Sequence, residues 1–291
     1  KLFKKGKSPL ASILIISLIG ILGFKDTGIF IKEYSATTGD NTEISFKEEE
    51  SVNILGERDR DYLVEKNQEK LHVPKDLVLK TSATSEDGIE ENPITIGVSQ
   101  VDKTIKGANN TYYVLLKGEA VMVMDYREGQ FTIIDEEGKE FKVNKDYISL
   151  RNSRHTTSRS GGITSRSSKV NSVVSNAYKE LGKPYRSGGT GPNGYDCSGL
   201  VYSLYLNHAD IKLNRSSRDQ VNNGVGVKKS ELVPGDIVLF RTWGKGIGHA
   251  GLYIGDGNMI HASSGKRKVM ITPIDEDWYK KRFVTARRII Q

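Results

Sequence analysis

The sequence predicts an α+β fold for the C-terminal part of the chain and two small β-barrels ahead of it. Apolar residues recur at helical spacing between residues 170 and 205, and short alternating runs follow them to residue 289. Helices followed by an antiparallel meander are typical of α+β domains. Alternating runs bounded by polar turns also fill residues 25–150, which is the pattern of small barrels.

The first 24 residues predict a membrane anchor or a signal peptide. Residues 8–24 carry no charge and follow a stretch rich in lysine, so the positive-inside tendency places the rest of the chain outside the cytoplasm. The apolar stretch is short for a spanning helix and long for a signal peptide, and no convincing small-x-small cleavage site follows Phe24. We therefore favour an uncleaved anchor, with a cleaved signal or a buried core helix as alternatives.

Residues 25–150 contain a weak internal repeat, with copies at 25–85 and 92–150. Each copy has short alternating strands, a polar turn and a closing Val-x-Lys-Asp segment, which begins at Val73 in the first copy and at Val143 in the second. The pattern resembles bacterial SH3-like domains, and this resemblance implies that the copies bind or position cell-wall peptide. Generic β modules are the alternative.

Residues 151–168 predict a flexible basic linker, because they have too few apolar side chains to offset the entropy of ordering. His155 lies in this linker and His72 lies on an expected strand of the first copy, and neither has partners at ligand spacing. The C-terminal domain, residues 169–291, is expected to begin with a helix that Ser168 caps.

Cys197 is the only cysteine of the chain and opens a second predicted helix. Its apolar face is formed by Cys197, Leu200, Val201, Leu204 and Tyr205. In the first turn of a helix, free amide groups and the positive end of the helix dipole favour a thiolate, so we expect a lowered pKa for this thiol. The alternative is a small buried hydrophobic residue.

His249 and His261 lie on two strand-like runs joined by the glycine-rich segment 255–257. A slip of one residue in the pairing would turn every side chain to the other face. A two-residue turn at 256–257 would leave the histidines on opposite faces, whereas a three-residue loop at 255–257 sets His261 opposite Gly251 and on the face of His249. We therefore expect the three-residue loop if the histidines act together.

These three residues suit nucleophilic catalysis. A neutral histidine can take the proton of Cys197, the thiolate can attack an amide carbonyl, and a third polar group can orient the imidazole. A cysteine at a helix start with two histidines on strands is the layout of a papain-like cysteine hydrolase. For each histidine, the alternative is a polar group on a half-buried strand. A zinc site is less consistent with the sequence, because the paired short spacings of structural zinc sites are missing.

Six motifs, in order along the chain, resemble NlpC-type cell-wall peptidases. They are Gly182-Lys183-Pro184-Tyr185, Gly188-Gly189, Asp196-Cys197-Ser198-Gly199-Leu200-Val201, Pro234-Gly235-Asp236, His249-Ala250-Gly251-Leu252-Tyr253-Ile254-Gly255 and Ile260-His261-Ala262. The resemblance covers about residues 170–290. It implies a papain-like fold with Cys197 as nucleophile, His249 as base and His261 as orienting group, without metal or cofactor. Family members cleave peptidoglycan stem peptides, commonly between γ-D-Glu and the diamino acid.

The resemblance extends to members with two SH3-like domains, which hold the free amino terminus of L-Ala-γ-D-Glu. The matching substrate-binding positions are Tyr185, Asp196, Ser198 and Ser217. Ser216 could replace Ser217, and Asp196 is equally suited to capping the helix. Because the expected linker is long, we favour a cleft that stays open to intact peptidoglycan.

The formal charge of +7 suits an anionic partner. No basic motif with interleaved aromatic residues is present, so nucleic acid is not expected as a partner. We expect a cell-wall hydrolase of a bacterium that acts on peptidoglycan stem peptides from the outer face of the membrane or after secretion. An N-acetylmuramoyl amidase or acyltransferase of the same fold and a non-catalytic wall-binding protein are the alternatives.

Overall fold

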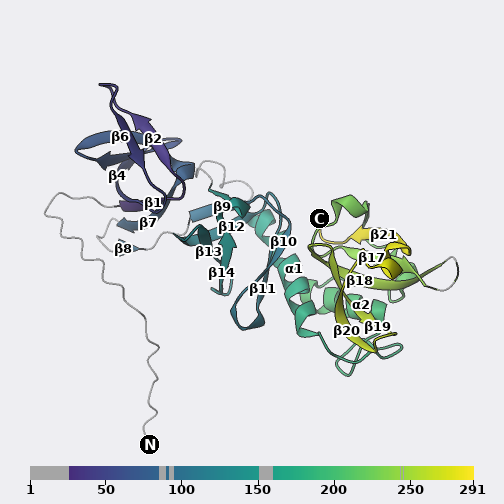
Figure 1. The fold of residues 1–291 in the computed structure, drawn as a ribbon. Coiled ribbons are helices and arrows are strands. Elements are labelled where there is room, and N and C mark those ends of the chain that lie inside the picture. Colours follow the sequence, from purple (N-terminus) through teal and green to yellow (C-terminus); the bar gives the residue numbers. More distant parts are fainter. Residues whose placement is uncertain (1–25, 85–89, 92–94, 151–159, 243, 245) are drawn as a thin grey trace, which may run out of the picture.

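The computed structural model describes residues 26–84, 90–91, 95–150, 160–242, 244 and 246–291. Figure 1 shows three regions in chain order, with the second strand-rich region between the first and the C-terminal domain. The predicted anchor or signal, residues 1–24, lies outside the described residues. None of the helices that are described has the length and apolar character needed to cross a membrane.

The first β region has the strand order β6-β5-β4-β1-β7-β8, with β2 and β3 as a separate hairpin. Burial alternates along β3 and β6, as expected for sheets with one face on a core. Phe30, Phe46 and Val64 belong to that core. The strands are β1 (Asp26–Phe30), β2 (Tyr34–Thr37), β3 (Glu43–Phe46), β4 (Ser51–Glu57), β5 (Asp61–Lys66), β6 (Glu69–Pro74), β7 (Val78–Thr84) and β8 (Glu90–Glu91).

The second β region repeats this topology, with the order β14-β13-β12-β9-β15 and a separate hairpin of β10 and β11. The closing segments of the two repeats form matching 3-10 turns, η1 (Lys75–Leu77) and η3 (Lys145–Tyr147). The internal repeat in the sequence is therefore a duplicated strand order. The strands are β9 (Thr95–Ser99), β10 (Lys103–Lys106), β11 (Tyr112–Leu115), β12 (Ala120–Arg127), β13 (Gln130–Ile134), β14 (Glu140–Asn144) and β15 (Ile148–Leu150).

The C-terminal domain has the α+β arrangement that the sequence predicts. Its antiparallel sheet has the order β16-β21-β17-β18-β19-β20, and α1 and α2 share one buried apolar cluster with β17, β18 and β19. The helices are α1 (Ser160–Lys179), α2 (Cys197–Ala209), α3 (Ser217–Gln220) and α4 (Asp277–Lys280). The strands are β16 (Val225–Val227), β17 (Ile237–Arg241), β18 (Ile247–Gly255), β19 (Asn258–Ser263), β20 (Lys268–Pro273) and β21 (Phe283–Arg288).

The start of α1 corrects the predicted linker of residues 151–168. Residues 151–159 lie outside the described residues, but residues 160–168 form the first part of α1. The reason is tertiary contact, which a count of apolar residues does not capture: Arg166 pairs with Glu119 of the second β region at 2.8 Å. The helix cap expected at Ser168 is therefore wrong.

The second β region packs directly on the C-terminal domain. Val114 and Leu116 join the apolar cluster of α1 and α2, and Tyr112 stacks on Tyr178 with ring centroids 3.5 Å apart. The side-chain amide of Asn171 bonds both the backbone N–H and the backbone carbonyl of Val114. These contacts join the two regions through a shared core.

Candidate active site

Helix α2 begins at Cys197 because Asp196 caps it. The carboxylate of Asp196 accepts the amide of Gly199 at 2.6 Å, and its backbone is extended, as an N-cap requires. Leu200 and Val201 on the following turn are fully buried. Local capping and the apolar stripe together place the thiol in the first turn, as the sequence predicts.

The sulfur of Cys197 lies against the main chain on both sides of His249. It donates to the carbonyl oxygen of Gly248 at 3.9 Å and receives the backbone amide of Ala250. The amides of Cys197 and Ser198 also interact with the sulfur. Helix α2 and strand β18 therefore meet where the predicted nucleophile, Cys197, lies against the main chain on either side of the predicted base, His249.

The expected lowering of the Cys197 pKa is wrong. Burial raises the pKa of the thiol, and the negative charge of Asp196 raises it further. The surrounding amides lower the pKa but do not outweigh burial. The thiol is therefore protonated at neutral pH, and it must lose its proton in order to react.

The two histidines form a buried hydrogen-bonded chain. Nε2 of His249 lies 2.9 Å from Nδ1 of His261, and Nε2 of His261 lies 3.0 Å from the hydroxyl of Thr272. His261 is fully buried and His249 is 8% exposed. Burial lowers the pKa of His249 to about 4 and that of His261 to about 3, with the charge of His249 adding to the second shift. Both rings are therefore neutral at pH 7.

The alignment of the histidines depends on a bulge, not on the three-residue loop that we expect from the sequence. Gly255 pairs with Asn258 across a two-residue turn, in which Asp256 and Gly257 both have positive φ. The register then shifts by one residue at Ile254, between Tyr253 and Gly255. A bulge adds one residue to one strand, so it restores the alignment that a plain two-residue turn would lose.

Gly251 allows the two strands to bring the histidines together. The pairing of Leu252 with Ile260 sets Gly251 opposite His261. A Cβ at position 251 would lie 2.7 Å from Sδ of Met259 and 3.3 Å from Cβ of His261. A side chain here would therefore require Met259 to move and would crowd His261.

Two residues that contact the histidines, Thr272 and Tyr279, are missing from the site that the sequence predicts. Thr272 is a buried residue on β20. The ring of Tyr279 on α4 lies 5.9 Å from that of His249 and 5.3 Å from that of His261, and burial raises its pKa to about 12. The buried positions of β20 do not alternate, so no local pattern indicates Thr272. Nothing local indicates that Tyr279 covers the histidines.

Asp196 forms an ion pair with Arg215, which sequence reasoning also missed. The guanidinium donates to both carboxylate oxygens, at 3.0 and 2.7 Å. The amide of Gly188 binds the same carboxylate at 2.9 Å. Ser198 is buried between this pair, with its hydroxyl 3.1 Å from Arg215. The helix-cap interpretation of Asp196 is confirmed, and its carboxylate is already fully bonded.

The other two substrate-binding candidates lie on separate segments of the C-terminal domain. Tyr185 is half-buried, and the charges of Cys197 and Asp196 contribute to raising its pKa, after burial. Ser217 is the first residue of α3, which packs beside β18. Ser216 caps α3 by accepting the amide of Asp219 at 3.1 Å. Of the two serines, Ser216 is therefore committed to its helix.

Within the part of the chain that the structure describes, no group of three or more His, Cys, Asp or Glu residues has the arrangement of a metal site.

The similarity of this chain to known proteins lies in the C-terminal domain. The model of the NlpC/P60 family matches residues 182–288. The probable endopeptidase NlpC of Escherichia coli is 40% identical over 109 residues, which are 37% of this chain and 70% of that protein.

Two further relatives match over smaller shares of their length. Murein DD-endopeptidase MepH of Escherichia coli is 38% identical over 116 residues, which are 38% of this chain and 43% of that protein. The gamma-D-glutamyl-L-lysine dipeptidyl-peptidase of Bacillus cereus is 42% identical over 112 residues, which are 38% of this chain and 33% of that protein. The chain thus spans less than half the length of these two relatives.

Proposed function

Because the chain belongs to the NlpC/P60 family, we propose that it is a cysteine peptidase that cleaves the stem peptides of peptidoglycan. The observation that carries the proposal is the hydrogen-bonded chain of His249, His261 and Thr272. It begins at His249, whose two neighbours in sequence, Gly248 and Ala250, contact the sulfur of Cys197 through their main chain. A buried neutral imidazole next to a thiol supplies the base that a cysteine nucleophile needs.

In this proposal His249 is the base and His261 orients it. With both rings protonated at Nε2, His249 donates to Nδ1 of His261, and His261 donates to the hydroxyl of Thr272. This arrangement leaves Nδ1 of His249 free to accept the proton of Cys197. Because burial raises the pKa of the thiol, Cys197 needs this base in order to lose its proton.

The reaction then follows an acyl-enzyme course. The sulfur bonds to the carbonyl carbon, and the amides of Cys197 and Ser198 stabilise the negative charge that develops on the oxygen. The C–N bond breaks, and His249 gives its proton to the leaving amine. Water then attacks the thioester, losing a proton to His249, which returns it to the sulfur.

We propose the bond between γ-D-Glu and the diamino acid as the target. The name of the Bacillus cereus relative supports this choice, because it specifies a γ-D-glutamyl bond. The name of MepH specifies a DD-endopeptidase, so cleavage of D,D cross-links is the competing outcome.

We propose that the cleft accepts stem peptides still attached to glycan. Both oxygens of Asp196 already bind Arg215, so a substrate ammonium would have to displace a guanidinium. The second β region also contacts Ile254 at the end of β18 and Asp256 in the turn that follows. His249 lies near the other end of this strand. Tyr185 and Ser217 remain proposed substrate contacts, while Ser198 supports Asp196 and Arg215.

The two β regions act, in this proposal, as SH3-like modules that bind wall peptide, supported by their duplicated strand order.

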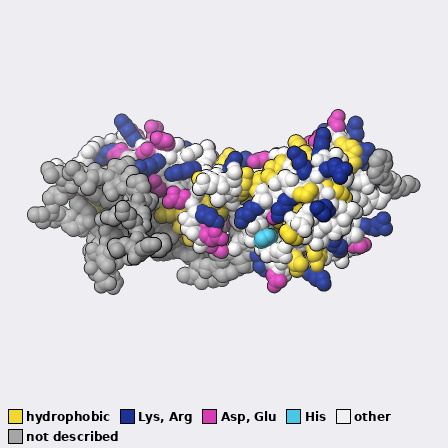
Figure 2. Space-filling model, turned by 90° about the horizontal axis from the view of Figure 1, so that it is seen from below, with side chains coloured by type: hydrophobic (Ala, Val, Ile, Leu, Met, Phe, Trp, Pro, Cys, Tyr) yellow, Lys and Arg dark blue, Asp and Glu magenta, His cyan; other side chains and the backbone are white. Residues whose placement is uncertain are grey.

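Residues 160–291 contain 20 Lys and Arg against 10 Asp and Glu, whereas residues 26–150 contain 15 against 26. Figure 2 shows Lys and Arg side chains distributed over its right-hand part. A basic catalytic domain suits an anionic wall. We propose that residues 1–24 anchor or export the protein, so that it acts outside the cytoplasm.

Digestion of purified peptidoglycan followed by mass spectrometry tests this function. We expect the wild-type chain to release products cut after γ-D-Glu, and Cys197→Ala or His249→Ala to release none. His261→Asn should keep partial activity, because an amide can still accept the imidazole N–H. Release of intact stem peptides from glycan would identify an amidase instead. Absence of any product from the wild type would contradict the proposal and favour a wall-binding protein.

A further inference from the structure

The second β region holds the end of β18 at the bulge. Thr104 on β10 donates its hydroxyl to the carbonyl of Ile254 at 2.6 Å. Its neighbour Lys103 lies 2.8 Å from both carboxylate oxygens of Asp256 in the adjoining turn. A Cβ at Gly255 would lie 3.3 Å from Pro234 and 3.5 Å from the backbone nitrogen of Thr104. The backbone at Gly255, just before the turn, is thus approached by Pro234 and by Thr104.

Ile254 is the residue on which the alignment of the histidines depends. It is the extra residue between the pairs Tyr253–Met259 and Gly255–Asn258. The extra residue of a bulge is left unpaired in the ladder. Thr104 supplies a donor to this carbonyl from a segment about 150 residues earlier in the chain. Without the bulge, His261 would face away from His249.

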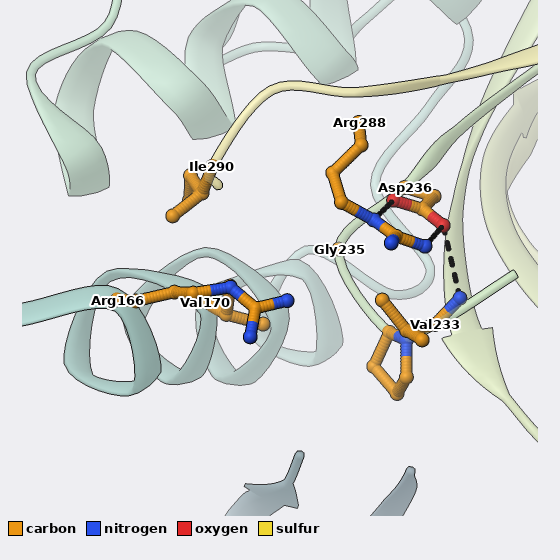
Figure 3. A pocket seen from close by; sticks show the side chains of 8 residues that line it. Arg166, Val170, Val233, Gly235, Asp236, Arg288 and Ile290 are labelled. Carbon is orange, nitrogen blue, oxygen red and sulfur yellow. Dashed lines mark hydrogen bonds and ion pairs between the residues drawn. The ribbon is translucent and has the colours of Figure 1, made fainter. Parts of the chain in front are cut away.

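The strand that carries Thr104 is itself fixed to the C-terminal domain. The hairpin of β10 and β11 is held by the two bonds between Asn171 and Val114. Figure 3 shows Arg166 of α1 facing the ion pair of Asp236 and Arg288 across a small pocket. Arg166 also pairs with Glu119, so α1 contacts both regions. Thr104 is therefore presented to Ile254 by a packed interface.

We propose that Thr104, assisted by Lys103, is a positioning residue that maintains the bulge at Ile254 and, through it, the alignment of His249 with His261. The proposal rests on the proposed function only for the kinetic part of its test. Thr104 touches neither histidine; it acts through the backbone of β18. The pair of Lys103 and Asp256 is partly exposed and contributes less, because exposed ion pairs stabilise little.

The test compares three variants of the full chain. Thr104→Val keeps the shape and removes the hydroxyl, and Thr104→Ser keeps the hydroxyl. Thr111→Val is the matched control, because Thr111 lies in the same hairpin and its hydroxyl bonds only the local carbonyl of Ala108 at 2.7 Å among the contacts described. We measure kcat and KM on soluble muropeptides, the melting temperature, and the proton NMR signal of the hydrogen bond between His249 and His261.

Thr104→Val should lower kcat by about 10-fold, the effect of losing about one hydrogen bond, with little change in KM and a shifted or broadened histidine signal. Thr104→Ser should restore both, and Thr111→Val should resemble the wild type. An unchanged signal in Thr104→Val, or equal changes in Thr111→Val, would overturn the proposal. If the wild type cleaves no muropeptide, the proposed function fails, while the histidine signal still decides the role of Thr104.

Discussion

The two histidines of the site share one hydrogen bond and lie almost entirely out of contact with water. Their pKa values fall to about 4 and about 3 from an ordinary value of 6.5. The unfolded chain therefore binds protons below pH 6.5 that the folded chain does not bind until the pH approaches 4. The buried neutral histidines therefore contribute their full share to the free energy of unfolding above pH 6.5. This contribution is lost as the pH falls from 6.5 towards 4.

We predict a loss of about 1.4 kcal/mol of unfolding free energy per pH unit for each buried histidine between pH 6.5 and 4. His261→Asn should remove one of these contributions and give a shallower dependence, measured by urea unfolding at a series of pH values. His72→Asn is the control, because His72 is exposed on β6 and lies outside the site. Equal slopes for wild type and His261→Asn would contradict the burial argument.

At the scale of elements, the hairpin of β18 and β19 determines the geometry of the site. The bulge at Ile254 brings both histidines to one face, and Gly251 leaves the space that this approach needs. Neither feature contributes a reacting group. Each acts by setting where the imidazole rings lie.

Gly251→Ala should reduce both stability and activity. The new methyl group would meet Sδ of Met259 and Cβ of His261, and overpacking of this kind costs about 1–3 kcal/mol. Urea unfolding and muropeptide hydrolysis measure the two effects. Gly265→Ala is the matched control, since a Cβ there meets nothing within 4 Å. A fully active Gly251→Ala protein would show that the strands can move apart without separating the histidines.

At the scale of the whole molecule, the C-terminal domain and the second β region share one apolar cluster. Val114 is almost fully buried, and its backbone N–H and carbonyl both bind the side chain of Asn171. This pair of bonds satisfies backbone groups that water cannot reach. The interface is therefore part of the fold of the C-terminal domain.

Asn171→Ala should lower the free energy of unfolding by about 1–3 kcal/mol, because it leaves buried backbone groups without partners. It should also speed hydrogen exchange at the amide of Val114. The control is Asn176→Ala on the same helix, where the side chain bonds a local carbonyl at 2.8 Å. If exchange at Val114 is equally slow in both variants, the interface does not depend on Asn171.

Several features of this protein could be predicted from the sequence, because they depend on neighbours along the chain. The helix that starts at Cys197 follows from the capping residue Asp196 and from apolar spacing. The repeat of 25–150 follows from alternation and turn residues, and it appears as a duplicated strand order. The requirement that His249 and His261 share a face also follows from the period of a strand.

Only the tertiary structure decided how these requirements are met. The bulge at Ile254 bonds Thr104, about 150 residues earlier in the chain. The ion pair of Asp196 with Arg215 and the cover of Tyr279 over the histidines join different elements of the C-terminal domain. The same holds for α1, which starts at Ser160 in a stretch poor in apolar residues. Propensity and periodicity describe what a segment does with its own neighbours. The bulge, the partly exposed ion pair and the polar start of α1 each have a bonding partner on another element of the chain.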